Sequence, residues 1–292
     1  MLEQAVIGLF QGALYGMLAV GLVLIYKGAR VFNFAQGEFG TIAGYATFGF
    51  WSGLRLPFPL AVLFGLVAAV LLGLVVERLI IRPLFNASRI TVLVATVGTA
   101  LLIIQLTFFI AKEEARILRP VIQSTDQIVI LGAVIGWQQI LTLLVLAALA
   151  LLLWLFFART NLGLAVLATS QDPLASRIVG ISVPGVSRFI WGFAALLGGI
   201  AGILQIGTPG FALVPGIMTG TTLVPAFTGA VLGGMTSLPG AFIGGVVVGI
   251  VQHVGIFALE ETGVPGASEL TVLGVLLLVL LIRPRGLLGT EA

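Results

Sequence analysis

The sequence predicts an all-α protein, a polytopic bundle of transmembrane helices with about eight to nine membrane segments that include broken or half helices. Of its 292 residues, 59% are hydrophobic and only 9% are charged; about a quarter of an average soluble domain is charged. Apolar runs close to the ~20 residues that cross about 30 Å of hydrocarbon recur along the whole chain. The runs lack the alternation of barrel strands, and backbone groups in lipid must bond internally, so each run is predicted to be a helix.

The runs belong to one integral membrane domain, 1–292, with no soluble domain attached. The first run lacks the preceding basic residues of a signal peptide, and we interpret it as a permanent span. The predicted spans lie at about 5–26, 34–50, 58–78, 91–111, 137–158, 189–206, 216–234, 238–258 and 269–282.

Positive charge sets the predicted orientation, because cytoplasmic loops of membrane proteins are enriched in Lys and Arg. With the N-terminus outside and the C-terminus in the cytoplasm, ten basic residues fall in inner loops and four in outer loops. The inner ones are Lys27, Arg30, Arg78, Arg82, Arg89, Arg159, Arg177, Arg188, Arg283 and Arg285, and the outer ones are Arg55, Lys112, Arg116 and Arg119.

The composition excludes several classes of protein. The chain has no cysteine for disulfide or thiol chemistry, and the single His253 cannot form a His-rich metal site by itself. No G-x-x-x-x-G-K-[ST] loop for nucleotide phosphates and no Ser/His/Asp cluster occur, so the chain is not predicted to be an enzyme. The pI near 9.8 reflects basic membrane loops rather than a surface for nucleic acid.

Glycines four residues apart are frequent among the 39 in the chain. This spacing lets helix backbones approach closely, which favours tight packing within a membrane bundle. The pattern occurs at Gly8, Gly12 and Gly16, at Gly229 and Gly233, at Gly240 and Gly244, and at Gly245 and Gly249.

The stretch NFAQGEF, 33–39, places two amides and a carboxylate at the start of a predicted span. Asn33 and Gln36 have the spacing of an N-cap and a capping-box partner for a helix beginning near Phe34, with Glu38 in its first turns and paired to Arg30 or Lys27. Alternatively, the stretch is a broken helix that lines a water-filled path, because acids inside spans usually face a cavity or a partner.

The inner loop, about 159–188, contains the signals of a short helix of its own. Asp172 is a favourable N-cap, Pro173 suits the first helical position and Gly180 suits the end, which predicts a helix over about 173–179. Such a short helix needs a surface to lie against. It either packs on the chain's own helix ends or docks into another protein as a coupling helix.

A second polar cluster interrupts the apolar run after Pro215. Thr221, Thr222 and Thr228 either bond backbone carbonyls within their own helix or line a path. Three prolines, at 209, 215 and 225, mark breaks that are typical of discontinuous helices.

Four stretches, in order along nearly the whole chain, resemble the permease subunits of ABC importers for branched-chain amino acids, the LivH type. They are NFAQGEF (33–39), QDPLASRIVGIS (171–182), GAVLGGMTSLPGAFIGGVVVGIVQ (229–252) and LLIRPRGLLG (280–289). The chain departs from the family at Gln36, where histidine is common. Glutamine can donate or accept a hydrogen bond but does not titrate near neutral pH.

The resemblance implies one part of a larger machine in a bacterial or archaeal cytoplasmic (inner) membrane. The implied partners are a second permease of the LivM type, two cytoplasmic ATPase chains that hold ATP and magnesium, and an extracytoplasmic binding protein. The permease itself is expected to hold no cofactor or metal, and no nucleic acid. Its implied cargo is a branched-chain or related amino acid, and relatives carry urea, short amides, or aromatic and other organic acids.

The implied mechanism is alternating access driven by the ATPase chains. The residues expected to form or dock the coupling helix are Asp172, Pro173, Leu174, Arg177 and Gly180, and the candidates for the translocation path are Asn33, Gln36, Glu38, Thr221, Thr222 and Thr228. The alternative is a secondary transporter or channel subunit for a small polar solute. It would need ion-coupling acids, and Glu38 is the one strong mid-span acid.

Overall fold

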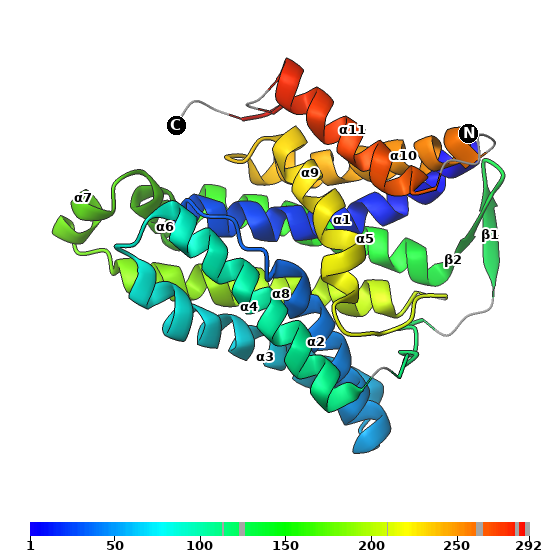
Figure 1. Ribbon diagram of the computed structural model, residues 1–292, viewed down its shortest axis with the longest axis horizontal. Helices are drawn as coiled ribbons and strands as arrows, with labels where there is room; N and C mark the ends of the chain where they lie inside the picture. The colour runs from blue at the N-terminus through cyan, green and yellow to red at the C-terminus, as the bar shows by residue number, and fades with distance from the viewer. Residues whose placement is uncertain (113, 123–125, 209, 261–264, 284–285, 290–292) are drawn as a thin grey trace.

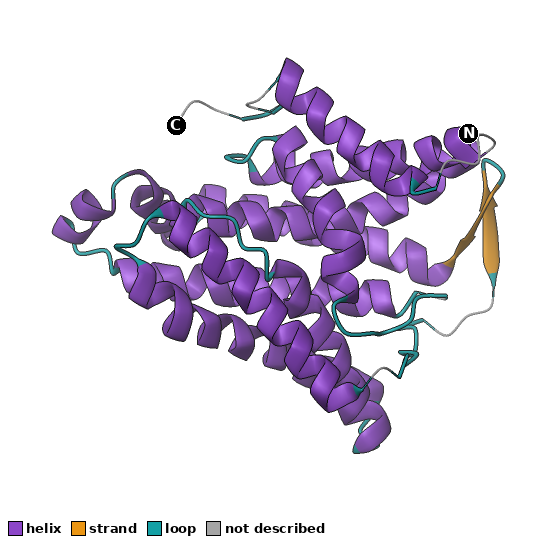
Figure 2. Ribbon diagram, in the orientation of Figure 1, coloured by secondary structure: helices purple, strands orange, loops and turns teal. Residues whose placement is uncertain are grey.

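The computed structural model describes residues 1–112, 114–122, 126–208, 210–260, 265–283 and 286–289. Within these ranges, only the backbone of residues 29 and 260 is described. The described chain is a bundle of helices with one small β-hairpin (Figures 1 and 2). Its α-helices are α1 Leu2–Ala29, α2 Gln36–Phe48, α3 Phe58–Val76, α4 Arg89–Ala111, α5 Trp137–Arg159, α6 Asn161–Gln171, α7 Pro173–Ile178, α8 Val183–Ile206, α9 Val224–Gly233, α10 Leu238–Glu260 and α11 Ala267–Ile282. Short π or 3₁₀ turns occur at Gly49–Gly53, Glu77–Ile81, Arg82–Leu84 and Thr219–Leu223, and the strands are β1 Gln127–Ile130 and β2 Ala133–Gly136.

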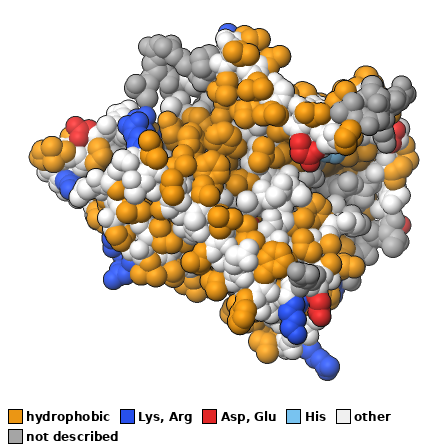
Figure 3. All heavy atoms as spheres, in the orientation of Figure 1, with side chains coloured by type: hydrophobic (Ala, Val, Ile, Leu, Met, Phe, Trp, Pro, Cys, Tyr) orange, Lys and Arg blue, Asp and Glu red, His pale blue; other side chains and the backbone are white. Residues whose placement is uncertain are grey.

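The predicted class of an all-α membrane bundle is confirmed. Among the described residues, six helices are long and apolar enough to cross a membrane: α1, α3 with its continuing turns, α4, α5, α8 and α10. The other predicted spans, at 34–50, 216–234 and 269–282, correspond to the shorter helices α2, α9 and α11. The face in Figure 3 is covered mainly by hydrophobic side chains, with Lys and Arg toward its edges, as expected for a lipid-facing surface.

Two of the shorter helices begin after an irregular stretch of chain. Residues 30–35 form no regular helix before α2, and residues 211–216 are irregular before the helical turns that lead through Thr219–Leu223 into α9. The predicted break at Pro215 lies in the second irregular stretch, whereas the break predicted at Pro225 is wrong, because helix is continuous from the π-helical turn into α9. Pro209, and Pro284 and Arg285 of the last predicted motif, lie outside the described residues.

Helices α1, α9 and α10 form a block in which glycines allow backbone contact, as the spacing predicted. A Cβ added at Gly12 would lie 2.6 Å from the carbonyl oxygen of Val246 in α10. One added at Gly229 of α9 would lie 2.5 Å from the Cα of Gly245. The glycine stripes of the three helices therefore bring the first helix and the last third of the chain into direct contact.

The hairpin and α6 were absent from the sequence prediction. Strands β1 and β2 pair antiparallel through the turn Leu131–Gly132, where both residues have positive φ (53° and 90°). Ile135 of β2 is buried in a cluster with Phe10 of α1, so the hairpin is fixed to the bundle. Helix α6 occupies the first half of the predicted inner loop, and its start is capped by Thr160, whose hydroxyl accepts a hydrogen bond from Gly163 N.

The helix ends form two opposite faces of the bundle. In Figure 1, α7 lies at one end of the long axis and the hairpin lies near the other end, beside the N-terminus. Helix α1 runs from the hairpin end to the α7 end, where Lys27 Nζ donates to Thr236 O in the α9–α10 turn (2.9 Å) and Arg30 donates to Ser170 O at the end of α6 (3.3 Å). Two of the basic residues predicted for the inner loops, Lys27 and Arg30, therefore lie toward α7.

Candidate functional site

The first candidate site is the junction where the two interrupted crossings meet, defined by residues 33–41 and 216–222. The first turn of α2 contacts the start of the π-helical turn Thr219–Leu223. A Cβ on Gly37 would lie 2.6 Å from Thr219 Oγ1 and 2.8 Å from Thr219 N, so only glycine permits this approach. The N-terminal ends of two helices, each carrying a partial positive charge, thus converge inside the bundle.

Asn33 and Gln36 are both fully buried at this junction. Helix α2 begins at Gln36 with Ala35 as the N-cap, so the predicted N-cap role of Asn33 is wrong by two residues. Asn33 instead closes the preceding turn, in which its Oδ1 accepts from Ala35 N (3.0 Å) and its carbonyl accepts from Gln36 N (3.2 Å). The short polar side chain of asparagine competes with the helical backbone in this way.

Gln36 connects the start of α2 to α8. Its Nε2 donates to the carbonyl of Ala194 in the middle of α8 (2.9 Å), and its Oε1 accepts from Asn33 Nδ2 (3.4 Å). The neighbouring position on α1 is Gly21, where a side chain would collide with the Gln36 amide. Gln36 therefore holds three separate parts of the chain together.

Glu38 is fully buried and faces the hydroxyls of Thr41 and Thr219. Among the described atoms, neither carboxylate oxygen has a hydrogen-bond partner of good geometry, and both hydroxyls are likewise unpartnered. The expected pairing of Glu38 with Lys27 or Arg30 is wrong, because those side chains bind Thr236 and Ser170 at the α7 end. A carboxyl group in this setting is costly to charge and is a candidate for a functional role.

The three predicted threonines have different surroundings. Thr222 is buried and donates to Gln205 Oε1 of α8 (3.0 Å), and Thr228 is buried with its hydroxyl bonded to Val224 O in its own helix (3.0 Å). Thr221 is exposed, although its hydroxyl bonds to Ile217 O (2.7 Å). Of the six path candidates, Thr221 alone lies on the surface, and the other five lie inside the chain.

Sequence reasoning did not anticipate the aromatic surroundings of this junction. A small cavity of about 70 Å³ beside Asn33 is lined by Phe32, Phe34 and Phe227 among others. The rings of Phe32 and Phe227 meet edge to face at a centroid distance of 5.2 Å. The FNF phrase at 32–34 was a possible signal, but Phe227 comes from a helix almost 200 residues later in the chain.

The second candidate site is helix α7, where the prediction of a short helix is confirmed. Asp172 Oδ1 accepts hydrogen bonds from Leu174 N (2.8 Å) and Ala175 N (2.9 Å), so it is the N-cap. Gly180 has φ +85°, and Ile181 N bonds back to Ser176 O (2.9 Å), which closes the end of the helix.

Helix α7 projects from one end of the bundle (Figure 1), and its apolar side chains are exposed. Leu174, Ile178 and Val179 are 68%, 80% and 75% exposed. These three side chains therefore do not pack on the chain's own helix ends, which was one of the two interpretations of this loop from the sequence. Three exposed aliphatic side chains on two turns are typical of a surface that another protein covers.

A second fully buried acid, Glu77, lies in the π-helical turn that continues α3. It forms an ion pair with Arg82 at 2.9 Å, and the Arg82 side chain is 29% exposed. Glu77 thus has a partner near the α7 end of the bundle, in contrast to Glu38 at the junction.

Comparison with known proteins gives a match over nearly the full chain. Residues 4–281 match the family described as branched-chain amino acid transport system / permease component. The high-affinity branched-chain amino acid transport system permease protein BraD of Pseudomonas aeruginosa is 29% identical over 99% of this chain and 95% of its own length. LivH of Escherichia coli K12 is 28% identical with the same coverage, and a probable LivH of Methanocaldococcus jannaschii is 28% identical over 94% of this chain and 88% of its own.

A solved structure with a related fold is PsaBC from Streptococcus pneumoniae in complex with Fab. It aligns with a TM-score of 0.50 at 21% identity and covers 96% of this chain and 91% of that chain. At this level of identity the likeness concerns the fold.

Proposed function

We propose that the chain carries a branched-chain amino acid or a closely related solute. It belongs to the family of branched-chain amino acid transport permeases and is a membrane permease component of an ABC importer. The full-length family match is the observation that carries the proposal. The relatives from Pseudomonas, Escherichia and Methanocaldococcus are all named as branched-chain amino acid permeases. Gln36, where histidine is common in the family, is the position at which this chain would differ in handling its solute.

The proposed mechanism couples ATPase chains to the bundle through α7. Its exposed Leu174 and Ile178 would enter the ATPase surface, while Asp172 and Gly180 fix the two ends of the helix. Arg177 lies in the last turn of the same helix and lines the space between α7 and the bundle. Because α7 is joined directly to α6 and α8, a push on it would be transmitted to the start of α8.

The α7 end is proposed to face the cytoplasm, with the N-terminus outside. Lys27 and Arg30 lie at the α7 end, and Arg89 and Arg177 line the cavity beside α7, which supports this orientation through the enrichment of positive charge on the inner side. The hairpin end would then face the extracytoplasmic binding protein. The chain would pair with a second, LivM-type permease, and ATP and magnesium would be held by the ATPase chains.

The junction around Glu38 is proposed to border the translocation path when the transporter changes state. Two helix N-termini, an unpartnered carboxylate and two unpartnered hydroxyls meet there, and such interrupted helices form the substrate sites of many transporters. In the present structure the junction is closed around Asn33, Gln36 and Glu38.

The first test is copurification of the tagged chain from its native membrane, with its partners identified by mass spectrometry. We expect two ATPase chains and a second permease for each complex. The double variant Leu174→Asp/Ile178→Asp should lose the ATPase chains and retain the second permease, because it charges the apolar surface of α7. Leu54→Asp is the control, since Leu54 is 66% exposed but lies at the opposite end of the bundle.

Isolation of the chain alone or as a homo-oligomer in several detergents would contradict the proposal and favour a channel or secondary transporter. Retention of the ATPase chains by the α7 double variant would contradict the docking role of α7 while leaving the importer proposal in place.

A further inference from the structure

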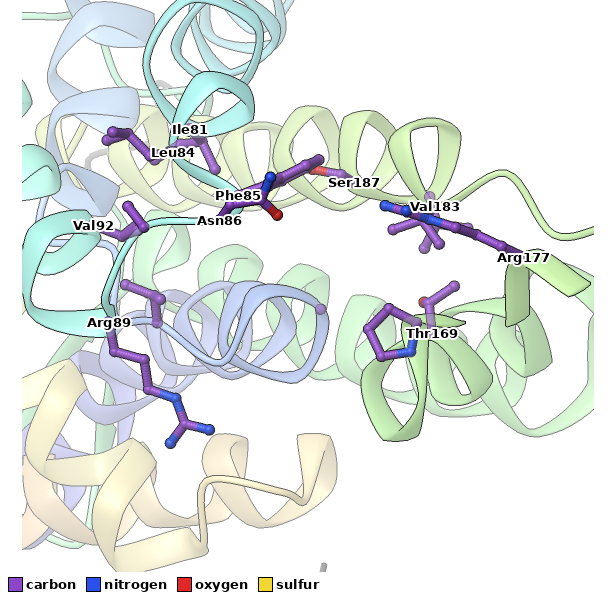
Figure 4. Close-up of a pocket in the computed structure, with 15 residues that line it drawn as sticks. Ile81, Leu84, Phe85, Asn86, Arg89, Val92, Thr169, Arg177, Val183 and Ser187 are labelled. Atoms are coloured by element: carbon purple, nitrogen blue, oxygen red, sulfur yellow. The ribbon is translucent and has the colours of Figure 1, made fainter. Parts of the chain in front are cut away.

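A cavity of about 420 Å³ lies between α7 and the rest of the bundle. Its walls come from the end of α1, the α3–α4 connection, the end of α6 and the beginnings of α7 and α8. Figure 4 shows the hollow between the α3–α4 connection with α8 on one side and α6 with α7 on the other. The proposed transport mechanism assigns no role to this cavity.

Polar groups converge at one side of the cavity. In Figure 4 the side chain of Arg177 reaches from α7 toward Val183, and the amide of Asn86 and the hydroxyl of Ser187 face the same space. Among the described residues, Ser187 Oγ is buried without a hydrogen-bond partner, and the guanidinium of Arg177 forms no hydrogen bond or ion pair. The guanidinium of Arg89, which also lines the cavity, points away from this group in the same view.

The charge balance around the cavity is positive. No acidic side chain is among its described lining residues, whereas two arginines are. The nearest acid in the sequence, Asp172, is occupied in capping α7 through Leu174 N and Ala175 N. A guanidinium with an amide and a hydroxyl beside it is the donor set that suits a phosphate or carboxylate oxygen.

The remaining wall is mainly apolar. Most of it is aliphatic, formed by Val31, Ile81, Leu84, Val92, Val183 and Val186, and Phe85 and Thr169 also line the cavity. A free inorganic anion needs only the polar side of such a cavity, whereas an amphiphile uses both sides. The cavity also lies where α1 ends and where α4 and α8 begin. The ends of membrane-spanning helices are expected at the depth of the lipid headgroups.

We propose that this cavity binds an anionic phospholipid. The phosphate lies against Arg177, Asn86 and Ser187, and the first methylenes of the lipid lie on the aliphatic wall. Basic pockets between transmembrane helices bind headgroups in this manner. A lipid here bridges α7 to the α3–α4 connection and to α8, so it fixes the position of α7 relative to the bundle.

The test is native mass spectrometry of the full-length chain, with any subunits that copurify, equilibrated with equal amounts of phosphatidylglycerol and phosphatidylcholine. The wild-type chain should retain phosphatidylglycerol in preference to phosphatidylcholine. Arg177→Gln should retain about fivefold less phosphatidylglycerol, because one charge–headgroup interaction is lost. Asn86→Trp, at an exposed position, should reduce retention by filling the cavity without changing the charge.

Arg188→Gln is the matched control, because Arg188 is exposed near the same helix end but does not line the cavity. It should retain phosphatidylglycerol as the wild type does. Equal retention by Arg177→Gln and Arg188→Gln would overturn the proposal, since the attraction would then come from general charge. Displacement of the lipid by millimolar inorganic phosphate in the wild type would also overturn the lipid assignment, because the site would then prefer the free anion.

Discussion

The α1–α9–α10 block and the junction around Glu38 are built from adjoining parts of the chain, yet their contacts differ in kind. In the block, glycines such as Gly12 and Gly245 bring backbones into contact, and the helices are continuous where they meet. At the junction, two helices begin inside the bundle, and the oxygens of Glu38, Thr41 and Thr219 lack partners among the described atoms.

The difference indicates which region holds the fold and which is able to change. Close backbone packing of the kind that these glycines allow gains dispersion energy and tolerates little movement. Burying a carboxylate without a partner raises the free energy of that conformation. A second conformation in which the carboxylate gains partners is therefore easier to reach. We infer that the block is the fixed frame and that the junction is the part that rearranges.

Filling the block should have the largest effect. Gly12→Leu places a side chain where even a Cβ would lie 2.6 Å from the Val246 carbonyl oxygen, so α1 and α10 must separate. Overpacking of this kind costs about 3 kcal/mol or more when backbone must shift. The measurement is thermal unfolding of the purified chain in detergent.

Gly98→Ala is the control for this substitution. Gly98 lies in α4, and a Cβ there meets no atom within 4 Å. The variant should be unchanged or up to about 1 kcal/mol more stable, because alanine favours the helix more than glycine does. If Gly12→Leu unfolds at the temperature of Gly98→Ala, the block is not the fixed frame.

The two buried acids provide an intermediate test. Glu77→Gln removes the charge that pairs with Arg82, and we expect a loss of about 1–2 kcal/mol in stability. Glu38→Gln removes a charge that has no described partner, so its stability should stay within about 0.5 kcal/mol of the wild type or increase. Urea unfolding of both variants measures the difference.

Transport assays of the same two variants sharpen the comparison. Glu38→Gln should lower solute uptake by reconstituted transporter, whereas Glu77→Gln should lower yield and stability but leave the uptake of each folded molecule near that of the wild type. Equal uptake by Glu38→Gln and the wild type would remove the junction from the proposed path.

The smallest effect is expected at α7. Asp172→Ala removes the cap of a six-residue helix, at a cost of about 1 kcal/mol. Hydrogen exchange of the α7 amides should accelerate about fivefold while the rest of the chain is unaffected. Asp172→Asn should behave as the wild type, since asparagine is an equally good cap. Equal exchange in the alanine and asparagine variants would show that capping is not what orders α7.

Local signals predicted much of this architecture. Apolar length placed the spans, and glycine spacing predicted close helix packing, although not that α1 would pack with α9 and α10. Asp172, Pro173 and Gly180 predicted α7 to within one residue of its end. Each of these features depends on residues that are neighbours in sequence. They could be predicted because hydrophobic length and helix capping are properties of short segments.

The contacts at the junction could not be predicted in the same way. The partner of Gln36 is a carbonyl 158 residues away, and the hydroxyl facing Glu38 from Thr219 is still more distant in sequence. The pairing of Glu38 with Arg30 was a reasonable local expectation, but the helix turns Arg30 toward Ser170 at the α7 end. The hairpin was missed because its two strands have only four residues each, which is much shorter than the apolar runs on either side.

The interrupted start of α2 has a consequence for how the protein is made. When the ribosome has synthesised residues 30–48, α8 and the turn at Thr219 do not yet exist, so Gln36 has no carbonyl of Ala194 to bind. Lys27 must likewise wait for Thr236, which is 209 residues further along. The second crossing therefore enters the membrane, or waits at the insertion machinery, with polar groups that only the last third of the chain can satisfy. Nascent chains that end before α8 should remain dependent on that machinery for longer than their hydrophobicity alone suggests.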